Sequence, residues 1–213
     1  MSDDGNTILP DSLRTELVDE TNVFLTDAKH PDGLRANWGL RLRSKLRARG
    51  QDVKQFEFGL TVTGRGKLFV EGKLVIDNWT KQRQGDAFFT LATVEEKGVI
   101  NVTPGDSPEI LVEFSNVSGP REGDPGGQPL QAGLRLGGRD VSDEDEAMQT
   151  AVDFAKAADV AVVIVGLNSD WETEGYDRTT LALPARTDEL VEKIAQANPR
   201  TVVVTQSVGV WYF

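Results

Sequence analysis

One apolar run followed by a run of polar residues constrains the fold more than any other stretch of the chain. Residues 159–165 read Asp-Val-Ala-Val-Val-Ile-Val. A run of Val, Ile and Ala is typical of a strand buried on both faces, as in a parallel sheet. The loop of residues 166–178 follows directly and holds four carboxylates, two aromatic rings and one arginine. Ligands bind outside the carboxyl ends of strands in open parallel sheets, so this loop stands where such a fold places its chemistry.

Helical periodicity flanks this strand on both sides. Ser142 is expected to cap a helix whose first turn holds the acidic residues 143–146, because the helix dipole favours negative charge there. The apolar stripe of this helix is expected to comprise Ala147, Ala151, Phe154, Ala155 and Ala158. A second helix is predicted over residues 187–197, with Leu190, Ile194 and Ala197 on one face. A second buried strand over 201–205 would then run parallel to the first through a right-handed crossover.

The C-terminal part predicts an incomplete domain. Two parallel strands cannot bury both faces of a sheet by themselves. The chain ends on the apolar residues Val210, Trp211, Tyr212 and Phe213, without a turn or a polar cap. We therefore expect residues 140–213 to form part of a larger α/β sandwich that is cut short.

The first part of the chain, residues 1–139, predicts an antiparallel β-sandwich. Its apolar residues alternate with polar ones in many short runs separated by turn residues. Glu71 and Gly72 lie between two such runs and predict a hairpin. Arg41 and Arg43 alternate with leucines and form either a binding stripe or a solvated strand face, of which the second is favoured. Strands are expected near 21–27 and over 38–43, 56–63, 67–70, 73–76, 88–94, 97–102, 109–114 and 130–136. The predicted fold class is therefore α+β in two parts, with a sandwich followed by a short parallel sheet.

Composition excludes several classes of protein. A formal net charge of -11 disfavours nucleic acid as a partner, since phosphate binding needs a basic surface. The chain has no cysteine and a single histidine, His30, so thiolate chemistry, a histidine metal site and a classical serine triad are not expected. No apolar run approaches the roughly 18 residues of a membrane span, and no membrane partner is expected. The first residues lack a signal peptide, which favours a cytoplasmic location. Neither a cofactor nor a metal is expected.

The loop after the first parallel strand carries the candidate chemistry. Glu172 and Glu174 lie two residues apart, with Asp170 and Asp177 nearby. Paired carboxylates serve in general acid–base catalysis and in glycosidic bond cleavage. Three further residues are expected to bind substrate: Trp171 and Tyr176 by stacking on a sugar, and Arg178 by fixing a carboxylate. A solvated acidic turn and a cation site are competing interpretations on residue types alone.

The sequence of residues 159–184 resembles the second, α/β-sandwich domain of family-three β-glucosidases, and residues 190–204 continue the likeness. In that family a Glu-Gly-Tyr motif on this loop carries the acid/base glutamate. The matching residues are Glu174, Gly175 and Tyr176. The resemblance therefore implies that Glu174 is the catalytic acid/base of a retaining β-glucosidase, whose substrate is a β-glucoside or an oligosaccharide. Glu172 is then only a neighbour.

Residues 56–79 and 84–89 resemble the protective-antigen-type β-sandwich that some of these enzymes carry as an insert in the second domain. Such inserts resemble carbohydrate-binding modules and border the entrance of the active site. Phe88 or Phe89 is the implied aromatic contact on the leaving-group side of the substrate. Core packing is expected for at least one of them, because adjacent strand residues face opposite ways.

The resemblance also implies what this chain does not contain. The family's nucleophile is an aspartate in a (β/α)8 barrel, and no such barrel is present here. The expected function is thus to supply the acid/base loop and a substrate-side sandwich to a β-glucosidase, with negligible activity of the chain alone. One alternative is a stand-alone carbohydrate-binding β-sandwich protein. Another is an inert truncated product that exposes its parallel strands and aggregates.

Overall fold

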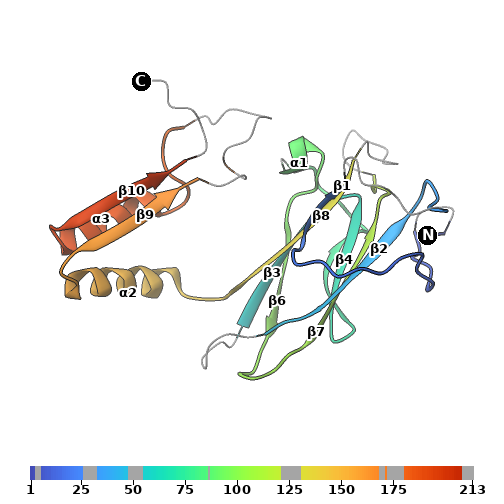
Figure 1. Ribbon diagram of the computed structural model, residues 1–213, viewed down its shortest axis with the longest axis horizontal. Coiled ribbons are helices and arrows are strands. Elements are labelled where there is room, and N and C mark those ends of the chain that lie inside the picture. The colour runs from blue at the N-terminus through green and yellow to red at the C-terminus, as the bar shows by residue number, and fades with distance from the viewer. Residues whose placement is uncertain are drawn as a thin grey trace. The chain divides into compact units, whose positions relative to one another are not determined.

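The computed structural model describes residues 1–2, 6–25, 33–47, 55–85, 87–120, 131–167, 171 and 180–207, without the side chains of residues 24, 25 and 89. The chain divides into two compact units, Met1–Val141 and Ser142–Phe213 (Figure 1). Within the described residues, the first unit contains eight strands and one helical turn, and the second contains two helices and two strands.

The first unit is built from two four-stranded antiparallel sheets. One sheet has the order β1-β8-β3-β6, with β1 at Asn22–Leu25, β8 at Ala132–Asp140, β3 at Gln55–Thr63 and β6 at Glu96–Asn101. The other has the order β2-β7-β4-β5, with β2 at Gly39–Lys45, β7 at Glu109–Ser115, β4 at Arg65–Val70 and β5 at Lys73–Asn78.

Both sheets contribute side chains to one buried core. β3 and β8 supply Phe58, Leu60, Val62, Leu134 and Leu136, and the other sheet supplies Leu68, Val70, Ile76, Ile110, Val112 and Phe114. These residues alternate with outward-facing ones along their strands, as the pleat requires. The predicted β-sandwich architecture is therefore confirmed. The Glu71–Gly72 hairpin is confirmed as well, because both residues adopt the positive φ angles, 48° and 72°, of a type I′ turn.

The strand predicted over residues 88–94 is wrong. A helical turn, α1, occupies Ala87–Thr90 instead (Figure 1). Residues on either side of it form a narrow ladder in which Gln84 bridges to Thr93 and the Gly85 N–H donates to the Ala92 carbonyl at 2.9 Å. The aromatic residues at this position favoured a strand. In the structure, pairing of residues 84–85 with residues 92–93 instead closes a turn that contains α1.

The second unit places two helices beside a two-stranded parallel sheet. The strands β9, Ala161–Gly166, and β10, Thr201–Gln206, pair in parallel with Ala161 opposite Thr201. The helices are α2, Glu144–Ala157, and α3, Thr187–Ala197, which begins and ends where the sequence predicts. One buried cluster joins Ala155 of α2 and Ile194 of α3 to Ala161, Val163 and Val165 of β9. The predicted fold class, α+β with a short parallel sheet, is confirmed.

Three details of this unit differ from the prediction. Asp143, not Ser142, caps α2, and its carboxylate accepts hydrogen bonds from the N–H groups of Asp145 and Glu146. Three residues of the predicted stripe are exposed, Ala147, Ala158 and Phe154, the last with 74% of its surface, and Met148 is buried instead. The parallel strands are not buried on both faces, since Val162 and Ile164 are 60% and 68% exposed. The helices cover one face of β9, whereas Val203 of β10 on the same face is 43% exposed, and no described residue of this unit covers the other face of the sheet.

Candidate functional site

The start of the candidate loop is fixed by backbone contacts at the carboxyl end of β9. The Leu167 N–H donates to the Gln206 carbonyl at 3.0 Å. A Cβ atom on Gly166 would lie 1.8 Å from that same carbonyl oxygen, so only glycine allows β10 to approach this closely. The chain therefore leaves the parallel sheet at a defined position, on the side where ligands bind in folds of this kind.

The predicted loop residues fall largely outside the part of the chain that the structure describes. Trp171 lies in a turn and is 46% exposed, so part of its ring is available to a ligand. Glu174, Tyr176 and Arg178 lie outside the described residues, together with the neighbouring carboxylates. Their roles stay predictions.

A network of charged groups holds the segment where the loop returns to α3. The Arg186 guanidinium donates to both carboxylate oxygens of Glu189, at 2.7 and 3.0 Å, and contacts Asp145 of α2 at 2.8 Å. Lys193 approaches Glu189 at 2.8 Å. Hydrogen bonds from Arg186 and then Lys193 lower the pKa of Glu189 to about 2, and the two carboxylates raise the pKa of Arg186. These contacts tie the returning chain to α2 and α3.

Asn198 makes a second link within this unit, directly after α3. Its side-chain amide is buried and donates to the carbonyls of Ala155 and Ala158 at 2.8 and 2.9 Å. Its Oδ1 accepts from the Arg200 N–H at 2.9 Å. Asn198 thereby joins the end of α2 to the start of β10. Sequence reasoning missed the contact of Asn198 with α2, because the partners lie 43 and 40 residues away.

The helical turn α1 carries the predicted aromatic contacts. Phe88 adopts φ 52° and Thr90 φ 66°, angles that bulky and β-branched residues rarely adopt. Backbone strain of this kind is concentrated at functional sites, where the surrounding structure maintains it. Phe88 is half-buried, and the side chain of Phe89 lies outside the description. The expected core packing of one ring rested on a strand, which the helical turn replaces, so the role of each ring stays a prediction.

The Gln84 side chain holds this turn in place. Its Nε2 donates to the carbonyls of Gly85 at 3.0 Å and of Ala92 at 3.1 Å, and it also donates to the carbonyl of Thr90. The Leu91 N–H closes the turn on the Phe88 carbonyl at 3.1 Å. Sequence reasoning missed Gln84, and no local pattern marks it, because its partners depend on the ladder around α1. Arg186 was also missed, although Glu189 three residues later was a signal for it.

The described residues offer no other obvious reaction centre. Among them, no group of three or more His, Asp or Glu side chains is placed to hold a metal ion. None of the helices in the described ranges is both long and apolar enough to cross a membrane.

Comparison with known proteins gives a consistent result. Residues 17–213 match the glycosyl hydrolase family 3 C-terminal domain. A protein of Aspergillus clavatus named "Probable beta-glucosidase I" is 38% identical over 204 residues, which are 90% of this chain and 23% of the relative. The "Probable beta-glucosidase J" of Neosartorya fischeri is 41% identical over 194 residues, which are 88% of this chain and 22% of that protein.

A solved structure extends the likeness to three dimensions. The crystal structure of a β-glucosidase from Kluyveromyces marxianus superposes with a TM-score of 0.76 at 33% identity, over 88% of this chain and 21% of that chain. The structure of that enzyme in complex with glucose gives a TM-score of 0.74. This chain thus spans less than a quarter of the length of these relatives. Because the family model covers nearly all of its residues, the protein belongs to glycosyl hydrolase family 3, to the C-terminal domain of that family.

Proposed function

We propose that this chain is the part of a retaining β-glucosidase that supplies the acid/base carboxylate, Glu174. The observation that carries the proposal is the 38% identity, over 90% of the chain, to a relative named as a β-glucosidase. The Glu174-Gly175-Tyr176 motif resembles the family's acid/base motif and lies within residues 17–213, which the family model matches. The substrate would be a terminal β-D-glucosyl residue.

Glu174 would act twice in each catalytic cycle. In the first step its carboxylic acid protonates the glycosidic oxygen as the leaving group departs, while a nucleophilic carboxylate bonds to the anomeric carbon. In the second step the Glu174 carboxylate takes a proton from water, which hydrolyses the glycosyl-enzyme. The nucleophile would belong to the (β/α)8 barrel of the full-length enzyme, about 5–5.5 Å from Glu174 in a retaining geometry.

The anchored ends of the loop support this role. β9 and β10 fix its start through Gly166 and Leu167, and Arg186 fixes its return. A catalytic carboxylate must be held close to its productive geometry by rigid elements. Trp171 and Tyr176 would stack on the sugar. Arg178 would orient a carboxylate, and it would lower the pKa of any carboxyl group that it approaches closely.

We further propose that the β-sandwich is a carbohydrate-binding insert that borders the substrate. Phe88 or Phe89 would contact the leaving-group side. The positive φ of Phe88 and the three hydrogen bonds from Gln84 to backbone carbonyls support this proposal. A strained turn that its surroundings hold in place is typical of a functional site.

The acid/base role is testable in a full-length relative. Replacing the glutamate that corresponds to Glu174 by glutamine should lower kcat for cellobiose about 10²–10⁴-fold, because the leaving sugar then departs without a proton. A dinitrophenyl β-glucoside, whose leaving group needs no proton, should still form the glycosyl-enzyme rapidly, and azide should restore turnover by attacking that intermediate. Unchanged activity on cellobiose would remove the role from this residue.

The need for a separate nucleophile is testable with the chain itself. We expect the purified 213-residue protein to show no turnover of nitrophenyl β-glucoside above that of a Glu174→Gln control. Steady turnover that the substitution abolishes would mean that the chain carries its own nucleophile.

A further inference from the structure

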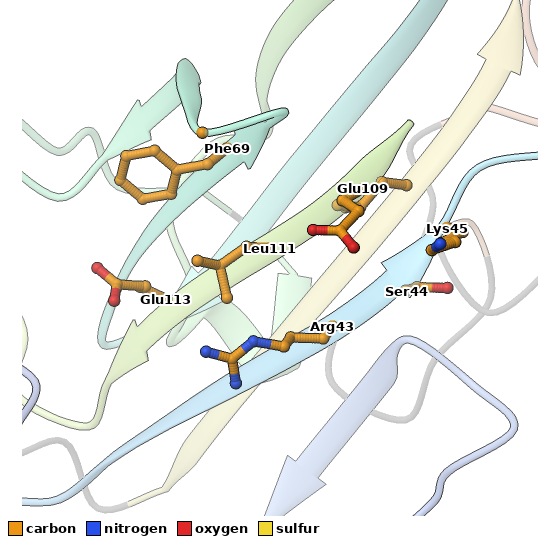
Figure 2. Close-up of a pocket in the computed structure, with 9 residues that line it drawn as sticks. Arg43, Ser44, Lys45, Phe69, Glu109, Leu111 and Glu113 are labelled. Carbon is orange, nitrogen blue, oxygen red and sulfur yellow. The ribbon is translucent and has the colours of Figure 1, made fainter. Parts of the chain in front are cut away.

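The outer face of the sheet β2-β7-β4-β5 carries a groove that the proposed function does not use. Its volume is about 630 Å³. It is lined from three neighbouring strands by Arg43 and Lys45 of β2, Glu109, Leu111 and Glu113 of β7, and Phe69 of β4 (Figure 2). These residues alternate with the inward-facing core residues, so the groove lies on the side of the sheet away from the sandwich core.

The floor of the groove is apolar. Leu111 lies opposite Arg43 on one neighbouring strand and opposite Phe69 on the other. Figure 2 shows Leu111 between Glu109 and Glu113 along β7, with Phe69 beside it on β4. Phe69 and Leu111 are both half-buried, so part of each side chain remains exposed. Phe69 and Leu111 thus offer an aromatic and an aliphatic surface on which the apolar face of a pyranose ring can pack.

The charged rim of the groove is only partly neutralised. Arg41 donates to Glu113 at 3.0 Å and also to the carbonyls of Ile8 and Leu9, so these two charges are satisfied. Arg43 and Lys45 form no ion pair within the described part of the chain, although Lys45 lies opposite Glu109. Two cations, neither in an ion pair with any described residue, thus lie beside the apolar floor of a chain whose net charge is -11, and Glu109 lines the same groove.

We propose that this groove binds an oligosaccharide that carries a carboxylate, such as a chain of uronic acid residues. The planar guanidinium of Arg43 matches a carboxylate in a two-point hydrogen bond, and Lys45 adds a second positive charge. The ring face packs on Phe69 and Leu111. The Glu109 carboxylate accepts hydrogen bonds from sugar hydroxyls. The lining of this site includes no residue of the loop 166–178, and binding there requires no catalytic step.

The test is calorimetric titration of the 213-residue chain with a trigalacturonate at low salt, beside the neutral sugar cellotriose and sodium acetate. We expect trigalacturonate to bind with Kd below about 10 mM, and the other two to bind at least about ten-fold more weakly. Arg43→Gln should weaken binding about ten-fold, because a charge-assisted hydrogen bond is lost, and Phe69→Ala about five-fold. The matched control Arg83→Gln removes the same charge from an exposed position paired with Glu96 and should leave binding unchanged.

The site is overturned if trigalacturonate does not bind at about 10 mM, if cellotriose or acetate binds equally well, or if the Arg43→Gln protein binds as tightly as the parent. Thermal melts of each variant establish that it is folded before titration. Since no turnover is measured, failure of this site would leave the role of Glu174 intact, and a loss of the Glu174 role would not affect the titration.

Discussion

The two units of the molecule bury their sheets differently. In the sandwich, each of the two sheets covers the other, and Leu60, Val112 and Phe114 are fully buried between them. In the α/β unit, two helices cover one face of the sheet, whereas Val162, Ile164 and Val202 remain more than half exposed on the other. A sheet in this class of fold normally has layers on both faces. The comparison shows that the sandwich buries the inner faces of both its sheets, whereas the parallel sheet has one face that no described residue of its unit covers.

The largest expected change in stability comes from replacing one phenylalanine in each unit, in turn, by alanine. Phe114→Ala should destabilise the sandwich by about 3–5 kcal/mol, because it leaves a cavity at the centre of the core. Trp38, whose ring centroid lies 5.8 Å from that of Phe114, provides a fluorescence signal for urea unfolding. Phe154→Ala in α2 is the matched control and should change stability by less than about 0.5 kcal/mol, since Phe154 is exposed. Equal effects of the two substitutions would contradict the contrast.

The next largest loss of stability is expected for a substitution of Gly166, with Gly137 as the control. Gly166→Ala should destabilise the α/β unit by at least about 2 kcal/mol, because the new methyl group would overlap the Gln206 carbonyl and separate β9 from β10. Gly137→Ala in β8 meets no atom within 4 Å and should be nearly neutral. Hydrogen exchange of the Leu167 amide reports the separation directly. Slow exchange of this amide in Gly166→Ala would show that the two strands tolerate the methyl group.

Adjacent valines of β9 test the two faces of the parallel sheet with one substitution. Val163→Thr places a hydroxyl in the buried cluster and should cost about 1–3 kcal/mol. Val162→Thr places the same hydroxyl on the uncovered face and should cost less than about 0.5 kcal/mol. Far-ultraviolet circular dichroism during urea unfolding measures both, because α2 and α3 lie in this unit. A similar cost at the two positions would indicate that the uncovered face is packed in solution.

The smallest expected effect is a dependence of stability on pH in the α/β unit. The pKa of Glu189 is about 2 in the folded protein, below its ordinary value of 4.5. Its ion pairs therefore stabilise the unit fully above pH 4.5, and this contribution is lost as the pH falls toward 2. Arg186→Gln removes the main cause of the shift and should flatten the fall of the urea midpoint across this range. Arg200→Gln should keep the fall, and a flattening there too would mean that total charge is responsible.

Local signals in the sequence predicted the elements that depend on local chemistry. The Glu71–Gly72 hairpin and the bounds of α3 follow from turn residues and from helical spacing, and both are confirmed. The N-cap of α2 was misplaced by one residue, because Ser142 and Asp143 are both good capping residues and backbone geometry selects between them. The predicted strand at Phe88 failed because contacts from Gln84 determine the turn.

The candidate site was predictable only in part. The position of the loop after β9 followed from the apolar run in residues 159–165, and the described start of the loop agrees with it. The anchors of that loop were not predictable, because Arg186 reaches Asp145 more than 40 residues away in sequence. The exposure of Val162 and Ile164 was not predictable from periodicity either. Their apolar character predicts burial, and the surface that would bury them is not among the described residues of this unit.

The pairing of β1 with β8 has a consequence for how this protein can be rearranged. These strands run antiparallel, with Asn22 opposite Arg135, so the chain enters the sheet and leaves it at the same end of two neighbouring strands. Because its two ends lie close together, a module of this kind connects to the rest of a polypeptide at one place. It can be grafted into a host loop, or excised and replaced by a short linker, without pulling the two cut ends apart.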